Sequence, residues 1–343
     1  MSGINQISKL LTNSALKSTV WYCRKHSQQI RLLSYVSKEY DEKNSPAPHF
    51  FNEKIQNLLL SLTRTDLQKV FQKRTVGSLE DPRFEFLTDK QLKEKLDEIR
   101  KVALKHLQFP PAVPVRTPKD KVFSRDPALK GYDTSKFVFT DISFGIKDND
   151  RIIAVRDTDG TLQEADWKTR DRMNQVYFPK THRQLKVPHL FNDSYFEDVL
   201  NNREYVFILD LACQQFEPDD PEYQRIASIT YQHINDNNAF DKLRSTRHFG
   251  SMTFFLVWNK MIDNLLLDLI DSCYLNEASE LIELYYSVHN IQVDNIGNIE
   301  LIGDFLKNHS NKQAILELAF QATKDFLKKK EETVEGIRKA HGH

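Results

Sequence analysis

The sequence predicts an α+β fold that is mainly α-helical, with a small antiparallel β element in the middle of the chain. Glycine is scarce, at 10 of 343 residues, which disfavours folds built on many tight turns. From residue 193 onward, apolar residues recur with the 3.6-residue period of amphipathic helices. Between residues 138 and 146, apolar and polar residues instead alternate, which is typical of strands.

Composition and the apolar stretches exclude several classes of protein. The chain is 40% hydrophobic and 28% charged, a globular balance in a chain long enough for two packed units. The longest apolar stretch, residues 249–258, is half of the roughly 20 residues that a membrane span needs, so we expect a buried helix and no membrane contact. Cys23, Cys213 and Cys273 are far apart, which predicts free thiols in a reducing compartment.

The N-terminal segment has the composition of a targeting signal. Residues 1–38 contain six basic residues and no acidic one, since the first acidic residue is Glu39. Four apolar residues would line one helical face of the segment: Ile4, Ile7, Leu10 and Leu11. A basic, acid-poor, amphipathic start predicts a mitochondrial transit peptide over residues 1–33, cut near Leu33. The alternative is a disordered basic tail.

Removal of this segment would change the charge of the chain. The whole sequence carries 48 basic and 48 acidic residues, and a cut after Leu33 removes five basic residues, which leaves a net charge of −5. Proteins that hold nucleic acid mainly through phosphate contacts are usually basic. We therefore expect limited, local RNA contact and a binding surface that faces mostly protein.

The N-terminal part after the transit peptide predicts a linker followed by helices. Apolar spacing predicts a helix over residues 49–63 and a stronger one over 89–107. Thr88 and Gln91 have the spacing of a capping box at the start of the second helix. Five prolines follow within residues 110–135, which predicts an extended connector and a boundary between units.

A β element should follow the connector. Alternating apolar residues over 138–146 and the short apolar run 152–155 predict two antiparallel strands joined by a turn. Residues 157–160, Asp-Thr-Asp-Gly, predict a second tight turn. A helix is expected over residues 164–177, and Pro179 should end it.

The sequence predicts helices throughout the C-terminal part, from residue 193 onward. Asp220 followed by Pro221 has the pattern of an N-cap and a first helical residue. Further helices are expected over residues 251–271, 276–289 and 312–329. Short loops between them predict an antiparallel helical bundle or an irregular helical solenoid.

These elements divide the chain into seven predicted regions. They are the transit peptide 1–33, a linker 34–48, an N-terminal helical region 49–109, a proline-rich connector 110–135, a β-hairpin plus helix unit 136–192, a C-terminal helical domain 193–329 and a charged tail 330–343.

One short string resembles an enzyme motif. The apolar run 152–155 leads into Asp157-Thr158-Asp159-Gly160-Thr161-Leu162, which resembles the first motif of haloacid dehalogenase phosphatases. In those magnesium-dependent enzymes the first aspartate attacks phosphorus and the second protonates the leaving group. Arg156 interrupts the apolar run before the first aspartate, and the helical downstream region supplies no further strand-borne ligands. A hairpin turn explains the same residues.

Other catalytic and cofactor motifs are absent from the sequence. It contains no Walker A loop, no dinucleotide-binding glycine motif, no nucleophile elbow and no paired-histidine zinc motif. We therefore expect no catalytic, cofactor-binding or metal-binding residues and no small-molecule substrate.

Two basic clusters are the candidate contacts with RNA or with neighbouring proteins. One comprises Lys168, Arg170 and Arg172 on the helix over 164–177, and the other contains Arg244 and Arg247. The arginine guanidinium group offers forked donors to phosphate or carboxylate. A solvated helix face or an internal ion pair is the alternative interpretation of both clusters.

Several longer strings resemble a known ribosomal protein family. The strings are Lys136-Phe137-Val138-Phe139-Thr140-Asp141-Ile142-Ser143, Arg170-Asp171-Arg172-Met173, Val176-Tyr177-Phe178-Pro179, Gln215-Phe216-Glu217-Pro218-Asp219 and Leu243-Arg244-Ser245-Thr246-Arg247. They resemble the family of the mitochondrial small-subunit ribosomal protein twenty-two, most densely over residues 136–258. The resemblance is looser from about 49 to 329, and the part beyond residue 290 departs most.

This resemblance implies a structural, non-enzymatic role. The family is specific to mitochondria and lies in the lower body of the small ribosomal subunit beside other ribosomal proteins. The resemblance implies a matrix protein that bridges ribosomal neighbours and makes limited contact with ribosomal RNA. A free RNA-binding adaptor of the matrix and the magnesium-dependent phosphatase remain the alternatives.

Overall fold

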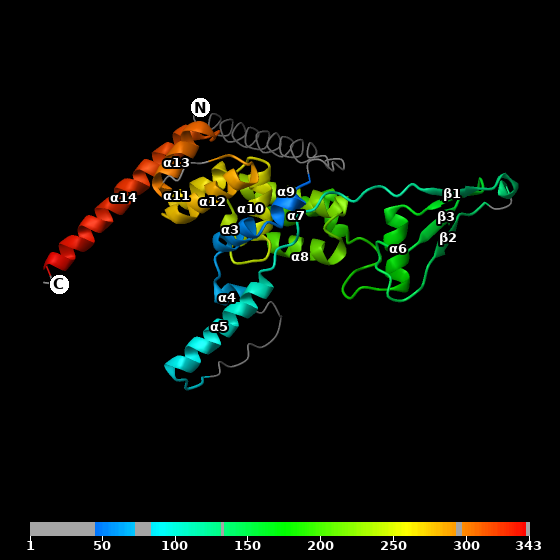
Figure 1. Ribbon diagram of the computed structural model, residues 1–343, viewed down its shortest axis with the longest axis horizontal. Coiled ribbons are helices and arrows are strands. Elements are labelled where there is room, and N and C mark those ends of the chain that lie inside the picture. The colour runs from blue at the N-terminus through cyan, green and yellow to red at the C-terminus, as the bar shows by residue number, and fades with distance from the viewer. Residues whose placement is uncertain (1–44, 73–83, 132–133, 293–296, 341–343) are drawn as a thin grey trace, which may run out of the picture.

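The computed structural model describes residues 45–72, 84–131, 134–292 and 297–340. It confirms the predicted fold class: a mainly helical chain with a small antiparallel sheet in the middle. Figure 1 shows an elongated molecule in which the sheet and α6 form one end, most helices form a central body, and α14 projects at the other end. The predicted transit peptide lies outside the described residues.

The N-terminal helices are α2 (Ala47–Phe50), α3 (Glu53–Thr63), α4 (Leu67–Val70) and α5 (Asp89–His106). The Asn52 side chain caps α3 by accepting from the Lys54 amide, so the predicted single helix over 49–63 is two helices. The first of them begins at Ala47, inside the predicted linker. The capping box of Thr88 and Gln91 is confirmed at the start of α5.

The sheet has four strands, β1 (Val122–Arg125), β2 (Phe137–Thr140), β3 (Ile153–Arg156) and β4 (Thr161–Glu164). Their order is β1-β4-β3-β2, and all neighbours are antiparallel. Helix α6 (Trp167–Tyr177) follows β4, and the short 3₁₀ helix η2 (Pro127–Leu129) follows β1. We call β1–β4 and α6 the sheet unit. Strand β1 lies in the predicted connector, which is therefore not wholly extended linker.

The first predicted strand, over 138–146, is too long. Strand β2 ends at Thr140, and the chain then loops back to β3. Buried Arg151 fixes this loop, since its guanidinium donates to the carbonyls of Asp141, Ser143 and Ile146 at 2.7, 2.9 and 3.0 Å. The alternation of apolar and polar residues over 138–146 gave no sign of this. It does not show that the Arg151 side chain takes up carbonyls that a neighbouring strand would otherwise bind.

The predicted turn at residues 157–160 is confirmed between β3 and β4. Gly160 has a φ of +85°, and a side chain there would meet the Asp126 carbonyl oxygen at 2.0 Å. The Asp126 amide in turn donates to the Gly160 carbonyl at 3.2 Å. Glycine is thus required both by the backbone conformation and by the close approach of the segment after β1.

The C-terminal elements are mainly helices. They are η3 (His189–Phe191), α7 (Asp193–Asn201), α8 (Tyr205–Gln215), α9 (Pro221–Asp236), η4 (Phe240–Lys242), α10 (Phe249–Trp258), α11 (Asp263–Asp271), α12 (Leu275–Val288), α13 (Asn298–Asn308) and α14 (Gln313–Ala340). The predicted helix over 251–271 is two helices, separated where Lys260 has a φ of +57°. Helix α14 continues to Ala340, so most of the predicted charged tail is helical.

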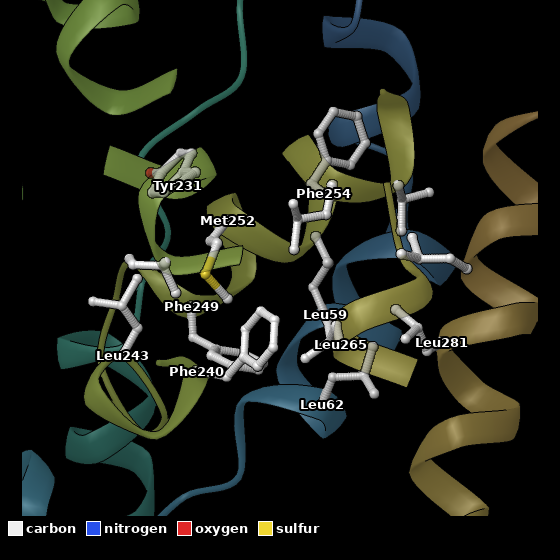
Figure 2. Packing of buried hydrophobic residues seen from close by; sticks show 14 of the residues in the cluster. Leu59, Leu62, Tyr231, Phe240, Leu243, Phe249, Met252, Phe254, Leu265 and Leu281 are labelled. Atoms are coloured by element: carbon white, nitrogen blue, oxygen red, sulfur yellow. The ribbon is translucent and has the colours of Figure 1, made fainter. Parts of the chain in front are cut away.

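One continuous apolar core joins α2 and α3 to the C-terminal helices; we call this assembly the helical body. In Figure 2, Leu59 and Leu62 of α3 lie among Phe254 of α10, Leu265 of α11 and Leu281 of α12. The N-terminal helices therefore complete a core whose other walls come some two hundred residues later in the sequence. The sheet unit has only a small core of its own, formed by Ile153, Val155, Ala165 and Met173.

None of the helices described is both long and apolar enough to cross a membrane. Helix α10 is almost entirely buried, as the sequence predicted for its apolar stretch.

Candidate assembly surface

The first basic cluster divides between the interior and the surface. Arg170 is only 1% exposed, because α6 turns it toward the sheet. Its guanidinium donates to the carbonyls of Arg151 at 2.5 Å and Asn149 at 3.2 Å, and it pairs with Glu164 at 3.2 Å. Arg170 therefore fastens α6 to β4 and to the loop before β3, and it is not accessible to a partner. Its burial in an internal ion pair is the alternative that the sequence left open.

Lys168 and Arg172 lie on the outer side of α6. Both side chains are exposed, and they are four residues apart, so they share one helical face. In the part of the chain that the structure describes, neither makes an ion pair. They remain the two members of the first cluster that are free to meet a partner.

The second basic cluster is divided in the same way. Arg244 is buried, donates to Asp268 at 3.1 Å and to the Leu62 carbonyl at 3.5 Å, and lies over the Phe249 ring at 4.9 Å. Burial raises the pKa of the Asp268 carboxyl, and the bond from Arg244 partly opposes that shift. Arg244 therefore joins α3, α10 and α11 inside the helical body.

Arg247 is the accessible member of this cluster. Its side chain is 38% exposed and pairs with Asp210 of α8, with nitrogen-to-oxygen distances of 3.0 and 3.1 Å. The buried His248 reaches the same carboxylate through Nε2 at 2.9 Å. A partner at Arg247 would meet a guanidinium that is already partly neutralised by Asp210.

The two aspartates of the enzyme-like string have structural partners. Asp157 accepts from the Gln163 side chain at 3.0 Å and pairs with Lys136 at 2.7 Å. Asp159 accepts from the amide and the hydroxyl of Thr161 at 2.9 and 3.0 Å, and these bonds lower the pKa of its carboxyl. Both residues therefore act as hairpin-turn residues. Among the described residues, no group of three or more His, Cys, Asp or Glu could hold a metal ion.

Sequence reasoning missed Arg116, which helps to fasten the sheet unit to the helical body. Arg116 lies in the proline-rich segment before β1, and its guanidinium pairs with Asp171 of α6 at 2.9 Å and with Asp220 at 2.7 Å. It also lies over the Trp167 ring, at 4.5 Å. Burial raises the pKa of the Asp220 carboxyl, which Arg116 opposes. Asp220 also caps α9, as predicted, by accepting from the Glu222 amide at 2.8 Å.

The sheet unit and the C-terminal helices differ in charge. Residues 110–192 carry 15 Lys and Arg against 11 Asp and Glu, whereas residues 193–343 carry 14 against 25. The excess of acidic residues is therefore concentrated in the C-terminal helices. Basic protein surfaces would be drawn to these acidic helices.

Comparison with known proteins gives the family. Residues 48–290 match the family model described as mitochondrial 28S ribosomal protein S22. The chain belongs to the mitochondrial 28S ribosomal protein S22 family. It is 36% identical over 291 residues to the small ribosomal subunit protein mS22 of Bos taurus, covering 82% of this chain and 81% of the relative. It is 34% identical over 307 residues to the Mus musculus protein of the same name, covering 88% and 85%.

The match to the S22 family spans both regions of the structure. Residues 48–290 include the whole sheet unit and the helical body from α3 to α12. Helices α13 and α14 lie beyond the matched residues, in the part where the family resemblance of the sequence is weakest. The basic residues Lys168, Arg172 and Arg247 all lie within the S22 match.

Proposed function

We propose that this protein is a structural constituent of the mitochondrial small ribosomal subunit and acts in mitochondrial translation in the matrix. The observation that carries the proposal is its similarity, over more than four-fifths of the chain, to two relatives named small ribosomal subunit protein mS22. Similarity of this extent includes the packed core and the sheet unit together. The acid-free N-terminal segment supports import into mitochondria.

The proposed role is to bridge neighbouring ribosomal proteins, with limited contact to ribosomal RNA. The elongated shape supports it, because the sheet unit and α14 lie at opposite ends of the molecule (Figure 1). The acidic C-terminal region suits basic protein neighbours, and the exposed Lys168 and Arg172 of the sheet unit suit a local RNA contact. The candidate contacts that the structure leaves accessible are Lys168, Arg172 and Arg247.

The proposed role is not enzymatic and involves no cofactor, small-molecule substrate or membrane. Asp157 and Asp159, the residues of the phosphatase alternative, are engaged in the turn between β3 and β4. The free matrix adaptor is the other alternative. It differs from the proposal in requiring strong RNA affinity outside the ribosome, with a steep dependence on salt.

Sedimentation of mitochondrial extracts tests the proposal. A tagged copy of the full chain, expressed in cells, should sediment with the small ribosomal subunit on a sucrose gradient. A copy that lacks residues 1–33 should remain cytosolic and should not reach the subunit. Tagged protein that enters mitochondria but stays at the top of the gradient would contradict the structural role and favour the free adaptor.

A further inference from the structure

One face of the sheet carries two exposed phenylalanines. Val138 of β2 pairs with Val155 of β3, and Val155 packs in the small core beneath α6. Because successive side chains of a strand point to opposite faces, Phe137 and Phe139 lie on the face away from α6. They are 45% and 49% exposed, a large exposure for aromatic rings in a regular strand. We call this side of the sheet the open face.

A cation lies beside these rings on the open face. Arg156 of β3 is the strand partner of Phe137, and its guanidinium lies 5.3 Å from the centre of the Phe139 ring. Within the described residues, Arg156 makes no ion pair. The carboxylate next to it in the chain, that of Asp157, pairs with Lys136 instead. An arginine that is held over an aromatic ring without a carboxylate keeps its forked donors available to an anion.

The opposite edge strand repeats the combination of aromatic and basic residues. In β1 and the residue before it, the Lys121 ammonium lies 5.8 Å from the Phe123 ring, and Arg125 is exposed two residues later. Both outer strands of the sheet therefore expose a phenylalanine with a cation close by.

We propose that the open face of the sheet binds an unpaired stretch of RNA, with bases stacked on Phe137 and Phe139 and with a backbone phosphate held by Arg156. The inference rests on the proposed function and names the surface of its RNA contact. Aromatic rings supply stacking surfaces that tolerate any base, and adjacent cations bind the phosphates. The two rings are about 7 Å apart along the strand, so each can receive its own base.

The combination of exposed rings with the Arg156 guanidinium favours RNA over a protein as the occupant. A protein that only needed apolar contact would gain as much from the acidic helical region, which also exposes apolar side chains such as Leu318 and Phe326. The open face instead combines the rings of Phe137 and Phe139 with Arg156, which makes no ion pair among the described residues. Paired RNA is disfavoured because its base faces are hidden within the helix.

Photochemical cross-linking in the assembled subunit tests the occupant directly. A photoreactive phenylalanine analogue is placed at position 139, the variant is incorporated into mitochondrial small subunits, and the adducts are identified after irradiation. An adduct with ribosomal RNA is the expected result. An adduct with a ribosomal protein, or no adduct from a variant that does incorporate, would overturn the inference. The same analogue at position 326 on α14 is the control and should give no RNA adduct.

Binding to a synthetic RNA tests the stacking chemistry. The full chain is titrated into a labelled, unstructured 12-nucleotide RNA, with anisotropy as the readout. Phe137→Leu with Phe139→Leu keeps apolar side chains in β2 but removes both stacking surfaces, so affinity should fall roughly tenfold or more. Phe326→Leu, the same exchange at an exposed phenylalanine of α14, should leave the affinity unchanged. Equal affinity of the two variants would overturn the inference.

Two further measurements separate stacking from general electrostatic attraction. Arg156→Gln should weaken binding and reduce its salt dependence by about one phosphate contact. A duplex of the same length should compete poorly with the single strand, and equal competition by the duplex would refute base stacking. Failure of these tests would leave the ribosomal role intact if the unmodified chain still sediments with the small subunit. Absence of that sedimentation would instead contradict the proposed function.

Discussion

The helical body and the sheet unit of this protein are stabilised in different ways. The helical body buries one continuous apolar core, from Phe50 near its start to Leu316 in α14. The sheet unit has a small apolar core and relies on buried arginines, with Arg151 and Arg170 holding its loops through backbone carbonyls. The comparison teaches that a region with a small core of its own can be ordered by charge-assisted hydrogen bonds.

The difference extends to the surfaces. The acidic C-terminal helices keep most aromatic rings inside, whereas the sheet unit leaves Phe137 and Phe139 half exposed. Arg116 fastens the two regions together through Asp171 and Asp220. Lys180 forms a second ionic connection, since it pairs with Asp148 in the loop between β2 and β3 and with Glu217 after α8. A stable body joined by ion pairs to an end with exposed aromatic rings is the arrangement that we expect of a bridging protein.

The largest effect should come from a cavity in the helical body. Phe254 is fully buried, and its ring meets that of Phe50 edge-on with the centroids 5.1 Å apart. Phe254→Ala should lower the free energy of unfolding by about 3–5 kcal/mol, since the lost contacts leave a void. Chemical denaturation followed by circular dichroism measures the change. Phe326→Ala, at a ring that is 56% exposed, is the control and should cost less than about 0.5 kcal/mol.

The next largest effect should fall on the sheet unit. Arg170→Met removes the guanidinium that pairs with Glu164 and donates to two backbone carbonyls. The free energy of unfolding of this region should fall by about 3 kcal/mol. Hydrogen exchange of the β3 and β4 amides should accelerate while exchange in α10 stays slow. Arg172→Met, on the exposed side of the same helix, is the matched control. Uniform acceleration in both regions would show that they unfold as one unit and would weaken the comparison.

A smaller effect should follow mild acidification, and it should appear in the helical body. Burial lowers the pKa of His233, whose Nδ1 lies 3.0 Å from the Tyr205 hydroxyl, and burial also lowers the pKa of His289. The unfolded chain then binds protons that the folded chain does not, so stability should fall as the pH drops below about 6.5. Urea unfolding at pH 7.5 and pH 5.5 measures this loss. His233→Gln should reduce it, and an unchanged loss would exclude His233 as a cause.

The two exposed basic residues of α6 should affect assembly rather than stability. Lys168→Ala with Arg172→Ala should reduce sedimentation with the small subunit more than Lys329→Ala with Lys330→Ala does in α14. Thermal melting of both double variants should match that of the parent chain, because all four side chains are exposed. Equal incorporation of the two variants would assign Lys168 and Arg172 to an ordinary solvated helix face.

The smallest effect is expected at the enzyme-like string. Asp157→Asn with Asp159→Asn should leave incorporation nearly unchanged, because asparagine also accepts the hydrogen bonds that these side chains receive in the turn. Loss of a magnesium-dependent phosphatase activity in a folded double variant would contradict the structural role of both aspartates.

Local sequence signals predicted elements where neighbouring residues alone decide the backbone. The capping box at Thr88, the Asp220 cap and the turn ending in Gly160 are of this kind, because each depends on contacts within a few residues. The predicted helix over 251–271 failed, since the break at Lys260 lies between two runs of similar apolar spacing. Strand β1 was missed because its partner, β4, lies almost forty residues later.

The sequence by itself determined the fold class, the turn at residues 157–160 and the family resemblance of the central strings, all of which depend on local order and composition. It could not determine which basic residues reach the surface. Arg170 and Arg172 are two residues apart, yet one is buried and one is exposed, because α6 packs one side against the sheet. Only the tertiary structure decided this, since burial depends on neighbours that are distant in the chain.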